Sequence, residues 1–132
     1  MRAIDTNVLV RLITRDDLKQ ATAADLFVQN GAWVSHLALV EATWVLSSVY
    51  DRTPSEIATV IEMLLDHQHL AIQDADIVRA ALAHFCRKPR IGFSDCLLLE
   101  VARQAGHVPL GTFDRDLGRL PGAERVRAVD SV

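Results

Sequence analysis

Cysteine is scarce in this sequence, and the two that are present, Cys86 and Cys96, do not form a CxxC pair. Both fall within helical patterns, which argues against a disulfide framework and against a cysteine-based zinc site. We expect both thiols to be buried packing residues. The five histidines show no spacing that would put two of them on one helix face as metal ligands, so we assign them no role.

Long hydrophobic runs are also missing. No apolar stretch approaches the roughly 20 residues that a membrane-spanning helix needs, and the N-terminus lacks the basic flank, apolar centre and cleavage site of a signal peptide. These absences predict a cytoplasmic protein without a membrane segment. Repeats, linkers and low-complexity segments are absent too, and 132 residues suit one domain, which we expect to span residues 1–132.

Excess positive charge is the third absence, since the formal net charge is −3. A protein that binds nucleic acid through a broad basic surface would be more basic. A nucleic-acid substrate stays possible, because acids in one cleft lower the net charge while bound divalent metals reverse it locally. Lysine occurs only at Lys19 and Lys88, and the arginine excess suits bidentate phosphate contacts. A composition bias of the source genome would explain that excess equally well.

What the chain does have is hydrophobic residues, which make up 50% of it and predict a well-filled core. Their spacing alternates between strand and helix periods, and the clearest signal is the capping box Thr53-Pro54-Ser55-Glu56. Such alternation implies a parallel sheet covered by helices on both faces. We predict strands over residues 2–5, 32–35, 70–72, 108–113 and about 125–129, and helices over 7–14, 16–30, 36–50, 53–66, 75–88, 94–105 and 115–119.

Two acids follow predicted strands. Asp5 ends the first strand and Asp114 ends the strand near the C-terminus. In open parallel sheets, ligands bind beyond the carboxyl ends of the strands, so both acids are candidates for an active site. Each has a simpler interpretation, because Asp5 or Asn7 suits the N-cap of the following helix and Asp114 suits a turn.

Two further acids stand in helices that are otherwise apolar. Glu41 lies near the start of the helix over residues 36–50, and Asp95 occupies the first turn of a late helix before Cys96. Burying an unpaired carboxylate costs several kcal/mol, so such a charge normally has a partner or a metal. Alternatively, Glu41 points along a solvated stripe and Asp95 only complements the helix dipole.

Four carboxylates that converge from separate elements would repel one another. Hard divalent cations such as Mg²⁺ and Mn²⁺ take oxygen ligands and relieve that repulsion. A metal of this kind also lowers the pKa of a bound water and stabilises the oxygens in a displacement at phosphorus.

The four acidic segments together resemble the PIN domain, and the small size and helix order are most similar to the VapC toxins of bacterial toxin–antitoxin pairs. The resemblance covers essentially the whole chain, and its strength lies in the ordered set rather than in any single motif. The segments that carry it are Asp5-Thr6-Asn7, Val40-Glu41, Phe93-Ser94-Asp95-Cys96-Leu97-Leu98 and Thr112-Phe113-Asp114.

The resemblance implies an α/β, three-layer PIN-like fold with a central, mostly parallel sheet of about five short strands flanked by helices. It implies a metal-dependent endoribonuclease that is a homodimer and is neutralised by a cognate antitoxin. Asp5, Glu41, Asp95 and Asp114 match the acidic quartet that binds Mg²⁺ or Mn²⁺. Thr6 or Asn7 and Thr112 match the polar positions beside the metal, and Asp116 could assist or replace Asp114.

An RNA backbone would also need cations at the rim of such a site. Arg87, Lys88 and Arg90 directly precede the Asp95 segment, and Arg115 follows Asp114. Arg11 and Arg15 also lie close to acids in the sequence. We expect these residues to contact phosphates, with an ordinary solvated surface as the alternative for each of them.

Two other classes of protein remain open. A phosphatase of the haloacid-dehalogenase type, or a receiver domain, also places an aspartate at a strand end. The phosphatase needs a second aspartate two residues later, where this chain has Asn7, and neither Lys19 nor Lys88 follows a strand end as both classes require. A non-enzymatic interaction module, with its acids as caps and surface residues, is the other alternative.

Overall fold

Short strands alternate with longer helices along the whole chain, as the sequence pattern predicts. The computed structural model describes residues 1–130. The chain divides into two units, Met1–Ala75 and Asp76–Val132, called here the N-terminal and the C-terminal unit. Each unit contains its own parallel strands and its own helices.

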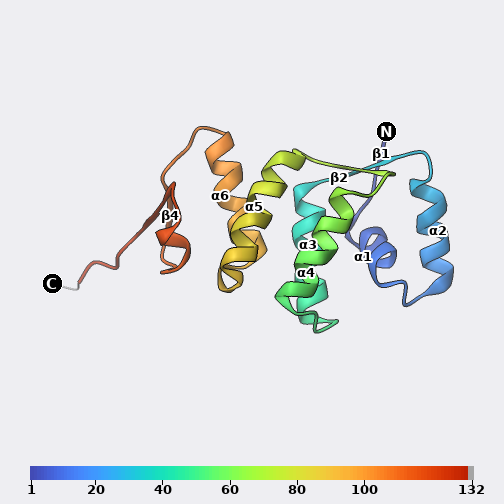
Figure 1. The fold of residues 1–132 in the computed structure, drawn as a ribbon, viewed down its shortest axis with the longest axis horizontal. Coiled ribbons are helices and arrows are strands. Elements are labelled where there is room, and N and C mark those ends of the chain that lie inside the picture. Colours follow the sequence, from blue (N-terminus) through green and yellow to red (C-terminus); the bar gives the residue numbers. More distant parts are fainter. Residues whose placement is uncertain (131–132) are drawn as a thin grey trace. The chain divides into compact units, whose positions relative to one another are not determined.

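The N-terminal unit contains a three-stranded parallel sheet in the order β1-β2-β3, of which Figure 1 labels β1 and β2. Ala3 of β1 lies opposite Trp33 of β2, and Val34 of β2 lies opposite Ile72 of β3. The elements of this unit are β1 (Arg2–Ala3), α1 (Thr6–Thr14), α2 (Leu18–Val28), β2 (Ala32–Val34), α3 (His36–Ser48), α4 (Pro54–Leu65) and β3 (Leu70–Ile72).

Side chains at the helix starts explain where these helices begin. The carboxylates of Asp5 and Asp17 accept hydrogen bonds from the backbone N–H groups three residues further on, at 2.9 and 3.1 Å. Thr53 and Glu56 form the predicted reciprocal capping box of α4. These bonds satisfy donors that a helix start otherwise leaves unpaired. The interpretation of Asp5 as a helix cap is therefore confirmed, and its other oxygen is left for further contacts.

The C-terminal unit holds two helices and a two-stranded parallel sheet. Leu110 of β4 lies opposite Ala123 of β5, and Thr112 lies opposite Arg125. Phe85 and Phe93 pack edge to face with their ring centroids 6.1 Å apart, and both are buried. The elements are α5 (Ala75–Arg87), η1 (Pro89–Ile91), α6 (Phe93–Gln104), β4 (Leu110–Thr112), η2 (Leu117–Arg119) and β5 (Ala123–Arg125).

The structure corrects three details of the sequence interpretation. The helix predicted over residues 94–105 starts one residue earlier, at Phe93, whose ring is buried, after Gly92 with a φ of 86°. The last strand lies at Ala123–Arg125 rather than over residues 125–129, because it pairs directly after the turn at Gly122. Of the two thiols, Cys96 is buried as predicted, whereas Cys86 is exposed.

Among residues 1–130, no helix combines the length and the apolar character that crossing a bilayer would require.

Candidate active site

The acids of the N-terminal unit meet where α1 begins. Asp5 is exposed and caps α1. Its neighbour Thr6 donates a 2.7 Å hydrogen bond from its hydroxyl to Oε2 of Glu41 on α3. The first turn of α1 therefore fixes the carboxylate of Glu41 beside the segment that carries Asp5.

Of the two interpretations of Glu41, the structure supports the one that places its side chain on a solvated stripe of the helix. Helix α3 buries the side that carries Leu39 and Leu46, whereas Leu37 and Trp44 are exposed by 69% and 67%. Residues spaced by four and three positions share a helix face, so Glu41 belongs to the exposed side with Leu37 and Trp44. The apolar sequence around Glu41 thus reflects large hydrophobic side chains at the surface.

In the C-terminal unit, Asp95 of α6 is affected by the charge of Asp114. Asp95 is half-buried in the first turn of α6. Burial raises the pKa of its carboxyl group above the usual value, and the negative charge of Asp114 raises that pKa further. A carboxyl group whose ionisation is disfavoured by burial and by a neighbouring negative charge marks a place where a cation would be stabilised.

The polypeptide after β4 holds Asp114 in place. Its backbone N–H donates a 3.0 Å hydrogen bond to the hydroxyl of Thr112, and its Oδ1 accepts a 2.7 Å hydrogen bond from the N–H of Leu117. The simpler interpretation of Asp114 as a turn residue is therefore confirmed. Asp114 is also exposed, and its Oδ2 takes no part in these two hydrogen bonds. Asp116 is half-buried just before η2.

Each unit therefore contributes two of the four predicted acids and the polar residue predicted to support them. In the N-terminal unit these are Asp5 and Glu41 with Thr6, and Asn7 is exposed beside them. In the C-terminal unit they are Asp95 and Asp114 with Thr112. Within neither unit, over residues 1–130, do three or more His, Cys, Asp or Glu side chains form a group that could hold a metal by itself.

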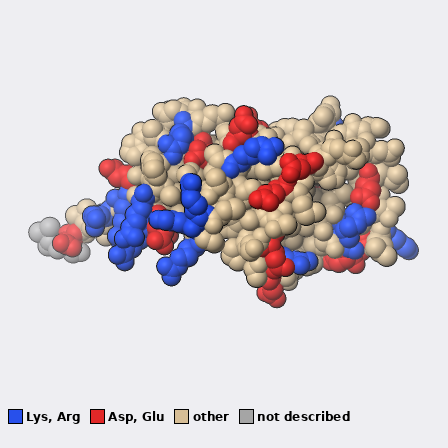
Figure 2. All heavy atoms as spheres, in the orientation of Figure 1, with Lys and Arg blue, Asp and Glu red and all other residues tan. Residues whose placement is uncertain are grey.

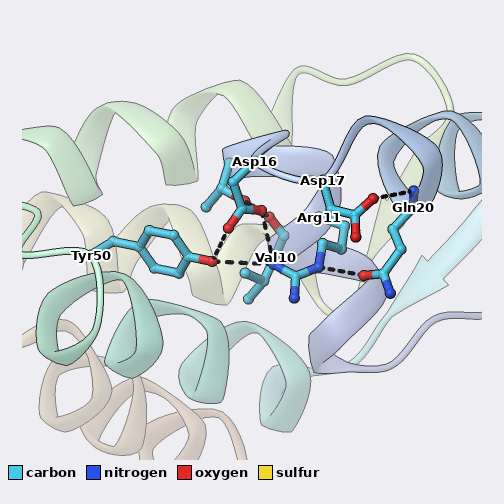
Figure 3. A network of polar contacts seen from close by, with 7 residues as sticks. Val10, Arg11, Asp16, Asp17, Gln20 and Tyr50 are labelled. Atoms are coloured by element: carbon cyan, nitrogen blue, oxygen red, sulfur yellow. Dashed lines mark hydrogen bonds and ion pairs between the residues drawn. The ribbon is translucent and has the colours of Figure 1, made fainter.

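The sequence analysis missed two polar networks. In Figure 3, Arg11 of α1 reaches Gln20, Asp16 and Tyr50, which lie nine, five and 39 residues away in sequence. In the C-terminal unit, Glu100 is only 8% exposed and contacts His84 and Arg103. The signal for Glu100 was present, because it follows Leu97-Leu98-Leu99 and is a charge within an apolar run.

The cysteine inside α6 is a packing residue. Burial raises the pKa of the Cys96 thiol to about 11, and the charges of Asp95 and Glu100 add to this effect. A thiol with such a pKa is not ionised near neutral pH and is therefore a poor nucleophile.

Most basic residues of the chain belong to the C-terminal unit. Residues 76–132 contain nine lysines and arginines against seven acids, whereas residues 1–75 contain five against ten. Figure 2 shows several of these basic side chains gathered on one face of the C-terminal unit. A unit with more basic than acidic residues offers a surface that attracts phosphates, in spite of the negative charge of the whole chain.

The basic residues predicted to contact RNA differ in their surroundings. Lys88, Arg90 and Arg115 are exposed, and their side chains form no hydrogen bond within residues 1–130. The guanidinium of Arg87 lies 3.1 Å from Nδ1 of His84. Arg11 and Arg15 instead pair with acids of the protein, which are Asp16 at 2.8 Å and Asp25 at 2.7 Å.

A family model described as the PIN domain matches residues 3–123. The chain belongs to the PIN-domain family. The match includes all four acids and extends over parts of both units, and it confirms the predicted α/β, PIN-like fold. Comparisons with curated proteins and with solved structures gave no match. PIN domains are typically metal-dependent nucleases, so membership supports nuclease activity for this chain.

The residues present suit the divalent metal that PIN domains generally use. All four predicted ligands are carboxylates, and oxygen donors are the preferred ligands of hard divalent cations. A raised pKa of Asp95 beside Asp114 is the expected property of carboxyl groups arranged to bind a cation.

Proposed function

We propose that this PIN-domain protein is a Mg²⁺- or Mn²⁺-dependent endoribonuclease and acts as a VapC-type toxin in the cytoplasm. The observation that carries the proposal is the PIN match over residues 3–123, a range that includes Asp5, Glu41, Asp95 and Asp114. The proximity of Asp95 and Asp114 in the C-terminal unit also supports the proposal. The negative charge of Asp114 raises the pKa of Asp95, and a bound divalent cation would relieve this repulsion.

In this proposal Asp5, Asp95 and Asp114 hold the metal, and Glu41 either binds it or orients the attacking water. The Thr6 hydroxyl restrains the carboxylate of Glu41 through its 2.7 Å hydrogen bond. Thr112 restrains the backbone at Asp114. When bound, the metal would supply an acidified water and stabilisation of the charge on phosphate oxygens. Asp116 is proposed to assist or replace Asp114 as a metal ligand. Asn7 is the alternative to Thr6 as the polar residue beside Asp5.

The RNA backbone is proposed to contact Arg87, Lys88, Arg90 and Arg115. All four side chains are exposed, and their charges stay available because no protein acid contacts them within the described part of the chain. Phosphate contacts of this type depend strongly on salt, since binding releases counterions from the RNA.

The partners proposed are a cognate antitoxin protein and a second copy of this chain. Both rest on the resemblance of the short chain and its helix order to VapC toxins. Growth of a bacterial host after induced expression tests the toxin role. The wild-type chain should stop growth and an Asp5→Asn variant should not; equal growth of both strains would contradict the toxin role.

The decisive experiment is cleavage of total RNA by purified protein with Mn²⁺ and with EDTA. Asp5→Asn should abolish cleavage. Asp17→Asn is a matched control, because Asp17 caps α2 as Asp5 caps α1 and is not part of the quartet. Asparagine is as good an N-cap as aspartate, so both variants should fold. Equal cleavage by Asp5→Asn and the wild type, or cleavage in EDTA, would refute the proposal.

A further inference from the structure

A cavity of about 370 Å³ opens between α1 and α2 in the N-terminal unit, and it is called here the α1–α2 cavity. Asp5, the first predicted metal ligand, forms part of its wall. The other residues used below are Asn7 and Arg11 of α1 and Gln20, Ala23 and Phe27 of α2. Pockets for small ligands have volumes of about 300–1,000 Å³, so this one suits a ligand of modest size.

The polar wall of the α1–α2 cavity is held rigid. Nε of Arg11 donates a 2.6 Å hydrogen bond to the side-chain oxygen of Gln20. Another nitrogen of Arg11 donates to Asp16 at 2.8 Å and to the hydroxyl of Tyr50 at 3.2 Å, as Figure 3 shows. Tyr50 in turn donates to the second oxygen of Asp16 at 2.7 Å. A wall fixed in this way can bind a ligand without first losing side-chain freedom.

This wall still offers free hydrogen-bonding groups. The oxygen of the Gln20 amide is used by Arg11, so the amide nitrogen keeps two N–H donors that meet no acceptor within residues 1–130. The amide of Asn7 likewise forms no side-chain hydrogen bond in the described part of the chain, and it adds a donor and an acceptor. Ala23 and Phe27 supply apolar surface beside these groups.

The charges around the α1–α2 cavity favour a neutral ligand. Arg11 is already paired with Asp16. The negative charge of Asp5 offsets the positive charge of Arg2, whose guanidinium lies 3.6 Å from the centroid of the Phe27 ring, so a phosphate group would gain little here. A ligand with an apolar face and a polar edge would use both kinds of wall. Nucleic-acid bases have this character, and unpaired RNA bases are bound by stacking on side chains and by hydrogen bonds to their edges.

We propose that the α1–α2 cavity is the subsite for one unpaired base of the RNA substrate, adjacent to the cleaved phosphodiester. Gln20 and Asn7 read the edge of the base. Ala23 and the side of the Phe27 ring that Arg2 does not cover contact its face. The inference rests on the proposed endoribonuclease function, and it assigns base selection to helices α1 and α2 rather than to the basic residues of the C-terminal unit.

The first test is the base preference of cleavage in a pool of short RNAs with randomised sequence. Gln20→Glu keeps the oxygen that Arg11 needs and removes the free N–H donors. Ala23→Leu fills the cavity. Thr22→Leu is the control, since Thr22 is exposed on the same helix and does not line the cavity.

We expect the wild type and Thr22→Leu to prefer one base at a fixed position from the cut by about tenfold, the scale of a good base contact. Gln20→Glu should lose or change that preference, and Ala23→Leu should raise KM as well. Wild-type preferences in both cavity variants would overturn the proposal.

The second test does not depend on cleavage. The four nucleosides are titrated into the metal-free protein, and backbone amide signals are followed by NMR. At least one nucleoside should shift signals of residues 5–11 and 20–27 in the wild type but not in Ala23→Leu. If no nucleoside shifts them, the subsite is refuted. If a nucleoside shifts them while the wild type cuts no RNA, the subsite is supported and the nuclease proposal fails.

Discussion

Nε2 of His84 on α5 lies 2.7 Å from Oε1 of Glu100 on α6. The other carboxylate oxygen of Glu100 accepts a 3.2 Å hydrogen bond from Nε of Arg103, which also donates to the backbone oxygen of Pro121. The guanidinium of Arg103 packs so closely on Gly122 that an added Cβ would lie 2.8 Å from it. Glu100 thus connects α5, α6 and the turn before β5.

Replacing Glu100 with alanine should destabilise the protein, because His84 and Arg103 lose their shared acceptor. Breaking a fully buried pair costs about 3–5 kcal/mol. Because the side chain of Arg103 is 40% exposed and can be hydrated, we expect a loss nearer about 2 kcal/mol in urea unfolding. Glu62→Ala, at an exposed position of α4, should change stability by less than about 0.5 kcal/mol. Equal effects of the two variants would show that the Glu100 network contributes nothing.

Replacing Thr6 with valine should lower cleavage while leaving the fold intact. Valine keeps the shape of the side chain and removes the hydroxyl that restrains Glu41 at 2.7 Å. We expect about a tenfold lower kcat and a stability loss of about 1 kcal/mol, the typical contribution of one hydrogen bond. Thr6→Ser, which keeps the hydroxyl, should restore the rate.

Thr59→Val is the matched control for the Thr6 experiment. Within residues 1–130, the hydroxyl of Thr59 bonds only the backbone oxygen of Ser55 in α4. This variant should cleave RNA at the wild-type rate. A fall in kcat of the same size in both variants would mean that the Thr6–Glu41 bond has no special role.

Local signals made much of the fold predictable. The strand at Leu70–Ile72 was predicted at the same residues, and the capping box at Thr53 fixed the start of α4. Both follow from neighbouring residues, because an apolar run and a cap act within a few positions. Asp5 and Asp114 were recognisable for the same reason, since each lies two residues after the end of a strand.

Features that depend on distant residues were not predictable. Glu41 is exposed because of which side of α3 is covered, and a sequence that is apolar on most sides of a helix does not show this. The start of α6 at Phe93 depends on the packing of its ring on Phe85. His84 and Glu100 meet across 16 residues, and Tyr50 meets Arg11 across 39. In each case tertiary packing decided the outcome.

Replacing Asp95 with asparagine should stabilise the metal-free protein at neutral pH. The raised pKa of Asp95 means that the folded protein binds its proton more tightly than the unfolded chain does. Its contribution to stability is therefore full below the unfolded pKa of 3.8 and is lost as the pH rises through the folded pKa. The variant avoids that loss of stability. In EDTA its free energy of unfolding should therefore exceed that of the wild type at neutral pH, and the difference should vanish as the pH falls towards 3.8.

Asp76→Asn is the control for the Asp95 experiment, because Asp76 is also an acid in a first helical turn but is exposed. Asp76→Asn should lower the free energy of unfolding by about 0.3–1 kcal/mol, because the favourable interaction of the carboxylate with the helix dipole is lost. This change has the opposite sign to the one expected for Asp95→Asn. Destabilisation of the metal-free protein by Asp95→Asn would contradict the predicted electrostatic strain.

Adding Mn²⁺ should reverse the order of the wild type and Asp95→Asn. A ligand that binds only the folded state at 100 times its Kd stabilises that state by about 2.7 kcal/mol. The wild type should therefore gain thermal stability in Mn²⁺, and the variant should gain much less. Equal gains in the two proteins would place the metal away from Asp95.

Replacing both Lys88 and Arg90 with alanine should flatten the salt dependence of RNA binding. Each phosphate contact on single-stranded RNA contributes about 0.7 to the slope of log K against log salt, so the double variant should lose about 1.4. Binding is measured in an Asp5→Asn background so that the RNA stays intact. Lys19→Ala with Arg52→Ala removes the same charge from the N-terminal unit and should leave the slope unchanged. An unchanged slope in the Lys88 and Arg90 variant would mean that these exposed cations do not contact the RNA backbone.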